Sequence, residues 1–126
     1  MSLRALICAA QPHISHALTL HLLRADVEVW TAGDSEHALD RLQMLHPDVV
    51  LVDLDMPGMT GWDVVAAANA RIVALTTRTA EAVTQESRAR GLEVDEILSA
   101  PFSPSALRSR IMAWDSESTK LVADRS

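Results

Sequence analysis

Residues Val49 to Gly61 read VVLVDLDMPGMTG. The apolar run at the start of this segment has the length of a buried strand, and the proline and glycines that follow indicate a loop. Asp53 stands where the strand gives way to the loop, and a second acid, Asp55, follows two positions later. Because open α/β sheets bind ligands outside the carboxyl ends of their strands, the segment predicts a functional site beside Asp53.

Short apolar runs alternate with helix-forming stretches on both sides of this segment. The expected strands are Arg4–Ala10, Val27–Thr31, Asp48–Asp53, Ile72–Thr76 and Val94–Leu98. Helical spacing and capping residues predict helices over Pro12–Leu23, Ala38–Leu45, Trp62–Ala70, Thr79–Arg90 and Ser103–Trp114. Five strand–helix units predict a doubly wound, flavodoxin-like (βα)5 parallel sheet of order 2-1-3-4-5, with helices on both faces.

Composition indicates one acidic globular domain. The chain has 126 residues and a net charge of −6, and its basic residues form no cluster, which argues against direct binding of nucleic acid. We expect the domain to span residues 3–114 and residues 115–126 to form a flexible tail or the start of a linker. The six-residue apolar run Ala5–Ala10 is far shorter than the ~18 residues of a membrane span. Cys8 is the only cysteine, so we expect a buried thiol and a cytoplasmic location.

The predicted strand order places the functional crevice between the first and third strands. Ala9 and Ala10 end the first strand, and Asp53 ends the third. Thr76 and Thr77 end the fourth strand, and Ala100 follows the fifth.

The motifs at these strand ends resemble the receiver domain of two-component response regulators, over about Leu3 to Trp114. Asp53 matches the phospho-acceptor aspartate of that family, and Thr76 matches the hydroxyl residue that contacts the acyl phosphate. Further matches to the family pattern are Pro12, Met56-Pro57-Gly58, Gly61 and Pro101-Phe102.

Four positions depart from the family pattern. Receivers carry two consecutive acids where this chain has Ala9 and Ala10, and a lysine where it has Ala100. Ile97 occupies the aromatic switch position on the fifth strand. The connection after the third helix is also several residues shorter than usual in the family.

These departures lead us to expect a degenerate phosphorylation pocket. Mg²⁺ prefers near-octahedral oxygen ligation, and of the family's donors this chain keeps only Asp53 and the Asp55 carbonyl. We expect the Asp55 carboxylate to point away, because side chains alternate along a strand. We therefore expect no resident cofactor, with Mg²⁺ bound only if the pocket is competent. Nothing in the sequence indicates an enzyme.

The resemblance implies a regulatory interaction module that acts through the face formed by Thr79–Arg90, Val94–Leu98 and Ser103–Trp114. Expected partners are a protein or an output domain, with a histidine kinase and a second copy of the chain as further candidates. We expect this regulation to be independent of phosphorylation. Two alternatives stay open: a conventional receiver phosphorylated on Asp53, and a small-molecule sensor that uses the vacated crevice.

Simpler structural roles are also open for several of these residues. Asp53 could cap the loop through backbone N–H groups, and Thr76 and Thr77 could be ordinary β-branched strand residues. Trp62 is expected to be a packing residue. The charges of the fourth helix are expected to form a solvated face; they are Glu81, Glu86, Arg88 and Arg90.

Overall fold

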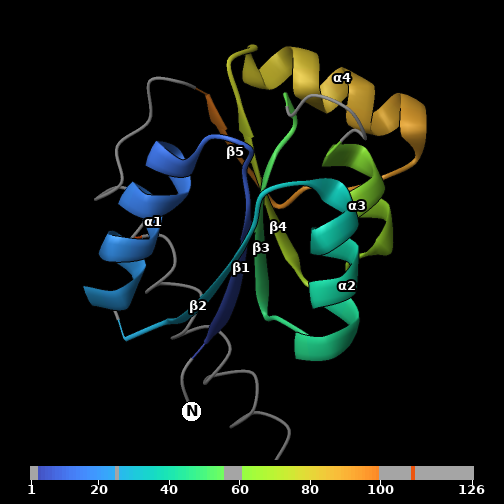
Figure 1. Cartoon of the computed structure of the whole chain (residues 1–126). Coiled ribbons are helices and arrows are strands. Elements are labelled where there is room, and N and C mark those ends of the chain that lie inside the picture. The colour runs from blue at the N-terminus through green and yellow to red at the C-terminus, as the bar shows by residue number, and fades with distance from the viewer. Residues whose placement is uncertain (1–2, 25, 56–60, 100–108, 110–126) are drawn as a thin grey trace, which may run out of the picture.

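A computed structural model of the chain describes residues 3–24, 26–55, 61–99 and 109. Within these residues, five strands alternate with four helices (Figure 1). The strands are β1 (Arg4–Cys8), β2 (Glu28–Ala32), β3 (Val49–Asp53), β4 (Arg71–Thr76) and β5 (Glu96–Ser99). The helices are α1 (Pro12–Arg24), α2 (Ser35–Leu45), α3 (Gly61–Ala67) and α4 (Ala80–Arg90).

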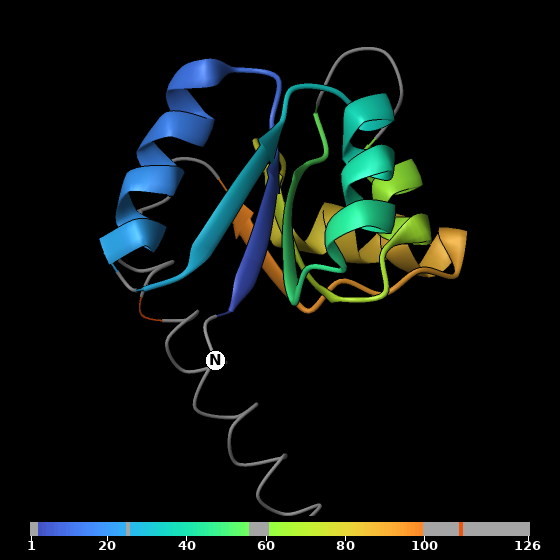
Figure 2. The ribbon, with the colours of Figure 1, turned by 60° about the horizontal axis from the view of Figure 1, so that its bottom comes forward.

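The strands form one parallel sheet of order β2-β1-β3-β4-β5, which confirms the predicted topology. Helix α1 covers one face of the sheet, and α2, α3 and α4 cover the other (Figures 1 and 2). The order reverses between β1 and β3, so the chain departs in opposite directions from the ends of these two neighbouring strands. This point is where a doubly wound sheet forms its crevice.

Both faces of the central strands are buried, as is typical of parallel sheets between helices. Along β1, Leu6 and Cys8 pack on the side of α2 and α3, whereas Ala5 and Ile7 pack on the side of α1. Burial raises the pKa of the Cys8 thiol to about 12, so the thiol stays protonated at neutral pH. The structure therefore agrees with the prediction that Cys8 is a small core residue.

Polar side chains cap the N-termini of two helices on the face of the sheet that α2, α3 and α4 cover. Asp34 accepts a hydrogen bond from the His37 backbone N–H at 2.8 Å and caps α2. Thr79 accepts one from the Ala82 N–H at 3.1 Å and caps α4, as predicted. Gly91 ends α4 with a φ of 67°, a left-handed conformation that favours glycine.

Four predicted element boundaries differ from the structure by more than one residue. Strand β1 ends at Cys8 rather than Ala10, and α2 begins at Ser35 rather than Ala38, directly after its cap Asp34. Helix α3 ends at Ala67 rather than Ala70, because the Arg71 N–H already bonds to the Asp48 carbonyl at 3.0 Å and commits the chain to the sheet. Strand β5 begins at Glu96 rather than Val94, because the Asp95 carboxylate takes the Ile72 N–H at 2.7 Å. That N–H is therefore not available for a ladder bond.

The predicted helix over Ser103–Trp114, apart from Ser109, and the predicted tail lie outside the described residues. No helix among the residues that the structure describes is long and apolar enough to cross a membrane.

Gly61 lets α3 start directly against the end of β3. A Cβ atom at this position would lie 2.8 Å from the Asp53 carbonyl oxygen and 3.0 Å from the Val52 Cγ2 atom. Real Cβ atoms essentially never approach backbone at 2.8 Å, so only glycine allows this contact. The close approach explains why a glycine follows the loop after Asp53.

Gly61→Ala should destabilise the domain by about 1–3 kcal/mol, the usual cost of forcing extra atoms into a packed site. Gly33→Ala is the matched control, because a Cβ at Gly33 meets nothing within 4 Å. Chemical denaturation of both variants measures the difference. Equal midpoints for the two variants would contradict the close contact.

Candidate functional site

The carboxyl ends of β1, β3 and β4 meet at one edge of the sheet. Ala9 directly follows β1 and is buried, and Ala10 after it is half-buried. Asp53 is the last residue of β3 and pairs with Leu75 of β4, one residue before Thr76. The structure thus brings most of the predicted pocket residues to one place, whereas Ala100 lies outside the described residues.

Asp53 is half-buried at the end of β3. Its Oδ1 atom accepts a hydrogen bond from the Asp55 N–H at 2.8 Å, which closes an Asx turn. Burial raises the pKa of the Asp53 carboxyl, the Asp55 N–H lowers it, and the nearby Asp55 charge raises it further. The contact that a simple strand-end cap requires is therefore present, and it occupies one oxygen of the candidate phospho-acceptor.

The expectation that the Asp55 carboxylate points away is wrong. Its Oδ2 atom accepts hydrogen bonds from the Thr77 N–H at 2.8 Å and the Thr77 hydroxyl at 3.1 Å, with the Thr76 hydroxyl at 3.4 Å. The chain has already left the strand for a turn at Leu54 and Asp55, so the alternation of a strand no longer governs the side-chain direction. The carboxylate turns toward the end of β4 instead.

Arg78 connects this carboxylate to α4. Its Nε atom lies 3.6 Å from Asp55 Oδ1, and its Nη1 atom donates to Glu86 Oε1 at 3.0 Å. Its backbone is held as well, because the Arg78 N–H donates to the Thr76 hydroxyl at 2.9 Å and the Ser99 hydroxyl donates to the Arg78 carbonyl at 2.9 Å. Arg78 therefore contacts the turn after β3 and residues of β4, α4 and β5.

Glu86 carries the connection on to α3. The indole Nε1 of the buried Trp62 donates to Glu86 Oε1 at 2.8 Å, and the Arg90 guanidinium lies 5.4 Å from the centre of the Trp62 ring. The hydrogen bond from Arg78 is the main cause that lowers the Glu86 pKa, and Trp62 and Arg90 also lower it. We call the four linked residues, Asp55, Arg78, Glu86 and Trp62, the Arg78 bridge.

The Arg78 bridge corrects part of the sequence interpretation. Trp62 is a packing residue, as predicted, and Glu81, Arg88 and Arg90 are exposed. Glu86 is half-buried and bound from two sides, so it does not belong to a solvated face. The i, i+4 spacing of Glu86 and Arg90 was visible in the sequence, but the contacts of Arg78 were not, because no local pattern brings Asp55 and Glu86 together.

Thr76 matches the family's phosphate-contacting hydroxyl residue, and Ile97 occupies the aromatic switch position. Thr76 is buried, and its hydroxyl is engaged by the Arg78 N–H and by Asp55. Ile97 pairs with Ala74 in the sheet and packs, half-buried, against the core on the side of α2, α3 and α4. Both side chains therefore already have structural contacts.

The acids near Asp53 differ from a metal-binding set. The described carboxylates of this edge are Asp53 and Asp55, and the two residues that directly follow β1 are Ala9 and Ala10. Among the residues that the structure describes, no group of three or more His, Cys, Asp or Glu side chains could hold a metal ion.

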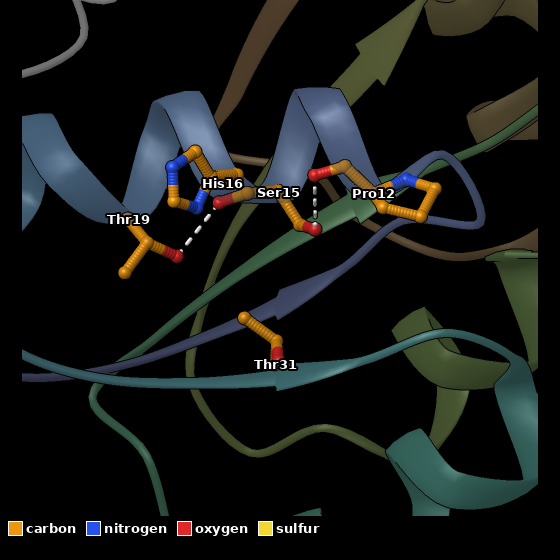
Figure 3. A pocket seen from close by; sticks show the side chains of 5 residues that line it. All are labelled: Pro12, Ser15, His16, Thr19 and Thr31. Atoms are coloured by element: carbon orange, nitrogen blue, oxygen red, sulfur yellow. Dashed lines mark hydrogen bonds between the residues drawn. The ribbon is translucent and has the colours of Figure 1, made fainter.

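A separate hollow lies between α1 and β2 (Figure 3). It has a volume of about 570 Å³, and its described lining residues are Pro12, Ser15, His16, Thr19 and Thr31. The Ser15 and Thr19 hydroxyls donate to carbonyls within α1, at 3.1 and 2.7 Å. None of the predicted pocket residues is among these lining residues, so the hollow is distinct from the crevice beside Asp53.

The chain matches the family model of the response regulator receiver domain over residues 5–112. It therefore belongs to the receiver domain family of two-component response regulators. It is 34% identical over 119 residues to the DNA-binding response regulator MtrA of Mycolicibacterium smegmatis, covering 90% of this chain and 50% of that protein. It is also 35% identical over 104 residues to the probable transcriptional regulator ycf27 of Cyanophora paradoxa, covering 78% of this chain and 42% of that protein. The chain thus spans about half the length, or less, of these relatives.

Solved structures agree with this assignment. The chemotaxis response regulator CheY4 of Vibrio cholerae is 30% identical, with a TM-score of 0.79 over 90% of this chain and 98% of that chain. A CheY-like receiver domain protein of Methanospirillum hungatei is 20% identical, with a TM-score of 0.83 over 95% of this chain and 98% of that chain. The second likeness shows the fold alone. Receiver domains are in general non-enzymatic regulators that interact with kinases and output domains.

Asp53→Asn should stabilise the domain at neutral pH. A carboxyl whose pKa is raised by folding contributes stability that is fully present below its unfolded pKa and is lost as the pH rises through the folded pKa. Asparagine keeps the oxygen that accepts the Asp55 N–H but carries no charge. The gain over wild type should therefore shrink as the pH falls below the ordinary range of aspartate.

Thermal unfolding across this pH range measures the effect. Asp26→Asn is the control, because Asp26 is an exposed acid whose positive φ asparagine tolerates, and it removes the same charge. A lower midpoint for Asp53→Asn than for wild type at neutral pH would show that burial of the charge is not the dominant effect.

Proposed function

We propose that this receiver domain acts as a regulatory protein–protein interaction module with a degenerate pocket, and that it signals without phosphorylation of Asp53. The observation that carries this proposal is the pair Ala9 and Ala10 at the end of β1. These residues adjoin the strand that ends on Asp53, where the family carries two acids. With so few carboxylates, this edge of the sheet lacks the negative charge that phosphorylation of the acceptor aspartate requires in the family.

The donor set beside Asp53 does not fit a magnesium ion. Mg²⁺ requires near-ideal octahedral oxygen ligation and is usually bound through one or two carboxylates. Asp53 already accepts a backbone N–H, and the Asp55 carboxylate is engaged by Thr77 and Arg78. We therefore propose that the domain has no resident metal, and that Mg²⁺ would bind only to a pocket made competent by substitution.

Phosphoryl transfer depends mainly on positioning and on neutralising negative charge. A phosphorylated Asp53 would lack the family lysine, because Ala100 stands at that position. It would also develop further negative charge close to Asp55, whose charge already raises the pKa of Asp53. Both effects favour an unmodified Asp53.

We propose that the domain contacts its partners through the face formed by α4 and β5, together with the predicted helix Ser103–Trp114. Candidate partners are an output domain, a histidine kinase and a second copy of the chain. MtrA is described as a DNA-binding response regulator, and this chain matches half of it. Since the chain carries a net charge of −6 and no basic cluster, we assign any DNA binding to an output domain rather than to this one.

Incubation with a small phosphodonor and millimolar Mg²⁺ should leave the intact mass of the wild-type domain unchanged. The matched gain-of-function variant is Ala9→Asp/Ala10→Asp/Ala100→Lys, which restores the missing groups and should acquire one phosphoryl group on Asp53. Asp53→Asn in the same background is the control and should stay unmodified. A phosphoryl group on wild-type Asp53 would establish the conventional receiver instead.

A magnesium titration followed by tryptophan fluorescence tests the metal separately. Trp62 lies in the first turn of α3, directly after the Asp53 loop, and is the expected reporter. We expect no response at millimolar Mg²⁺ in the wild type and a saturable response in the restored variant. A saturable wild-type response would contradict the proposal. Stabilisation by a small molecule in a thermal-shift screen would instead favour the sensor alternative.

A further inference from the structure

The end of β4 presents a set of donors that is suited to an anion. The Thr77 N–H, the Thr77 hydroxyl and the Thr76 hydroxyl converge on one oxygen at 2.8, 3.1 and 3.4 Å. Backbone N–H groups and hydroxyls at a turn commonly bind carboxylate or phosphate oxygens, and bonds to a charged acceptor are stronger than neutral ones. These three donors therefore form an anion half-site at the end of the strand.

The anion in this half-site belongs to the chain itself. The oxygen is Oδ2 of Asp55, which is separated from Thr77 by 22 residues, so the contact is no local cap. The other carboxylate oxygen, Oδ1, faces the Arg78 guanidinium. Both oxygens of Asp55 are thus engaged, although 31% of the side chain is exposed.

The half-site is linked to Arg78 by an ion pair, in which Arg78 Nε lies 3.6 Å from Asp55 Oδ1 without forming a hydrogen bond. Arg78 reaches Glu86 at 3.0 Å, and Glu86 accepts the indole N–H of Trp62, which is only 3% exposed. Because Trp62 belongs to α3 and Glu86 to α4, this hydrogen bond joins the two helices. The Arg78 bridge thus runs from the strand end to the helix that begins the proposed partner face.

We propose that Asp55 is a built-in anion that fills the half-site at the end of β4 and, through Arg78 and Glu86, holds α4 against α3 in a single arrangement. The inference rests on the proposed function and deepens it, since it supplies the contact that sets the partner face without modification of Asp53. An isolated exposed ion pair would contribute little to holding α4 against α3. Asp55 instead combines a backbone N–H, two hydroxyls and a guanidinium on one carboxylate.

Two-dimensional ¹⁵N NMR of the wild type and Asp55→Ala tests the inference directly. The Thr77 amide reports on the half-site, and the Trp62 indole N–H, assigned with Trp62→Phe, reports on the α3–α4 contact. Both signals should shift in Asp55→Ala. Inorganic phosphate should then move the Thr77 amide saturably in this variant and leave it unmoved in the wild type.

Three further variants separate the steps. Glu93→Gln removes the same charge from an exposed position before β5, and it should leave both signals in place. Asp55→Asn keeps an acceptor oxygen. The Thr77 amide signal should therefore stay closer to its wild-type chemical shift in this variant than in Asp55→Ala. Arg78→Met interrupts the bridge without vacating the half-site, so it should shift the Trp62 indole and create no phosphate binding.

Unchanged Thr77 and Trp62 signals in Asp55→Ala would overturn the inference. Equal phosphate shifts in wild type and Asp55→Ala would do the same, because the half-site would then be open to external anions. If Asp55→Ala does not fold, Asp55→Asn and Arg78→Met supply the same two readouts. Failure here is distinguishable from failure of the proposed function, which is decided by the intact mass of the wild-type domain.

Discussion

The parallel pairing of β3 with β1 on one side and β4 on the other is the constraint on which the rest of the structure depends. Val49 to Val52 are all buried, so β3 can exist only between neighbours and beneath helices on both faces. Its pairings bring the ends of β1 and β4 to the same edge as Asp53. The described residues at the ends of β1, β3 and β4 owe their positions in the candidate site to this arrangement.

At that edge the chain replaces one set of electrostatic contacts by another. The acids and the lysine expected of the family are alanines, yet the edge has not become apolar. Asp55 and Arg78 bring an acid and a base from different positions, and Thr76 and Thr77 supply donors between them. Asp55 and Arg78 thus form an ion pair at this edge, an arrangement on which our proposal of signalling without phosphorylation rests.

The sequence predicted the fold well because its signals are local. Apolar runs identified all five strands, and Thr79 and Gly91 marked both ends of α4 correctly. The predicted ends of α3 and β5 were wrong because long-range contacts decide them: the Arg71 N–H bonds to the Asp48 carbonyl, and the Asp95 carboxylate accepts the Ile72 N–H. The predicted direction of the Asp55 side chain was wrong because a turn interrupts the alternation of the strand.

The sequence by itself determined the family, the strand order and the place of Asp53 at a strand end. It also determined which groups are missing, since Ala9, Ala10 and Ala100 can be read directly. Only the tertiary structure decided which charges meet. The Asp55–Thr77 contact spans 22 positions and the Trp62–Glu86 contact spans 24, and both form only once β3, β4, α3 and α4 are packed together. Local sequence patterns carry no information on such pairs, because their partners become neighbours only through the fold.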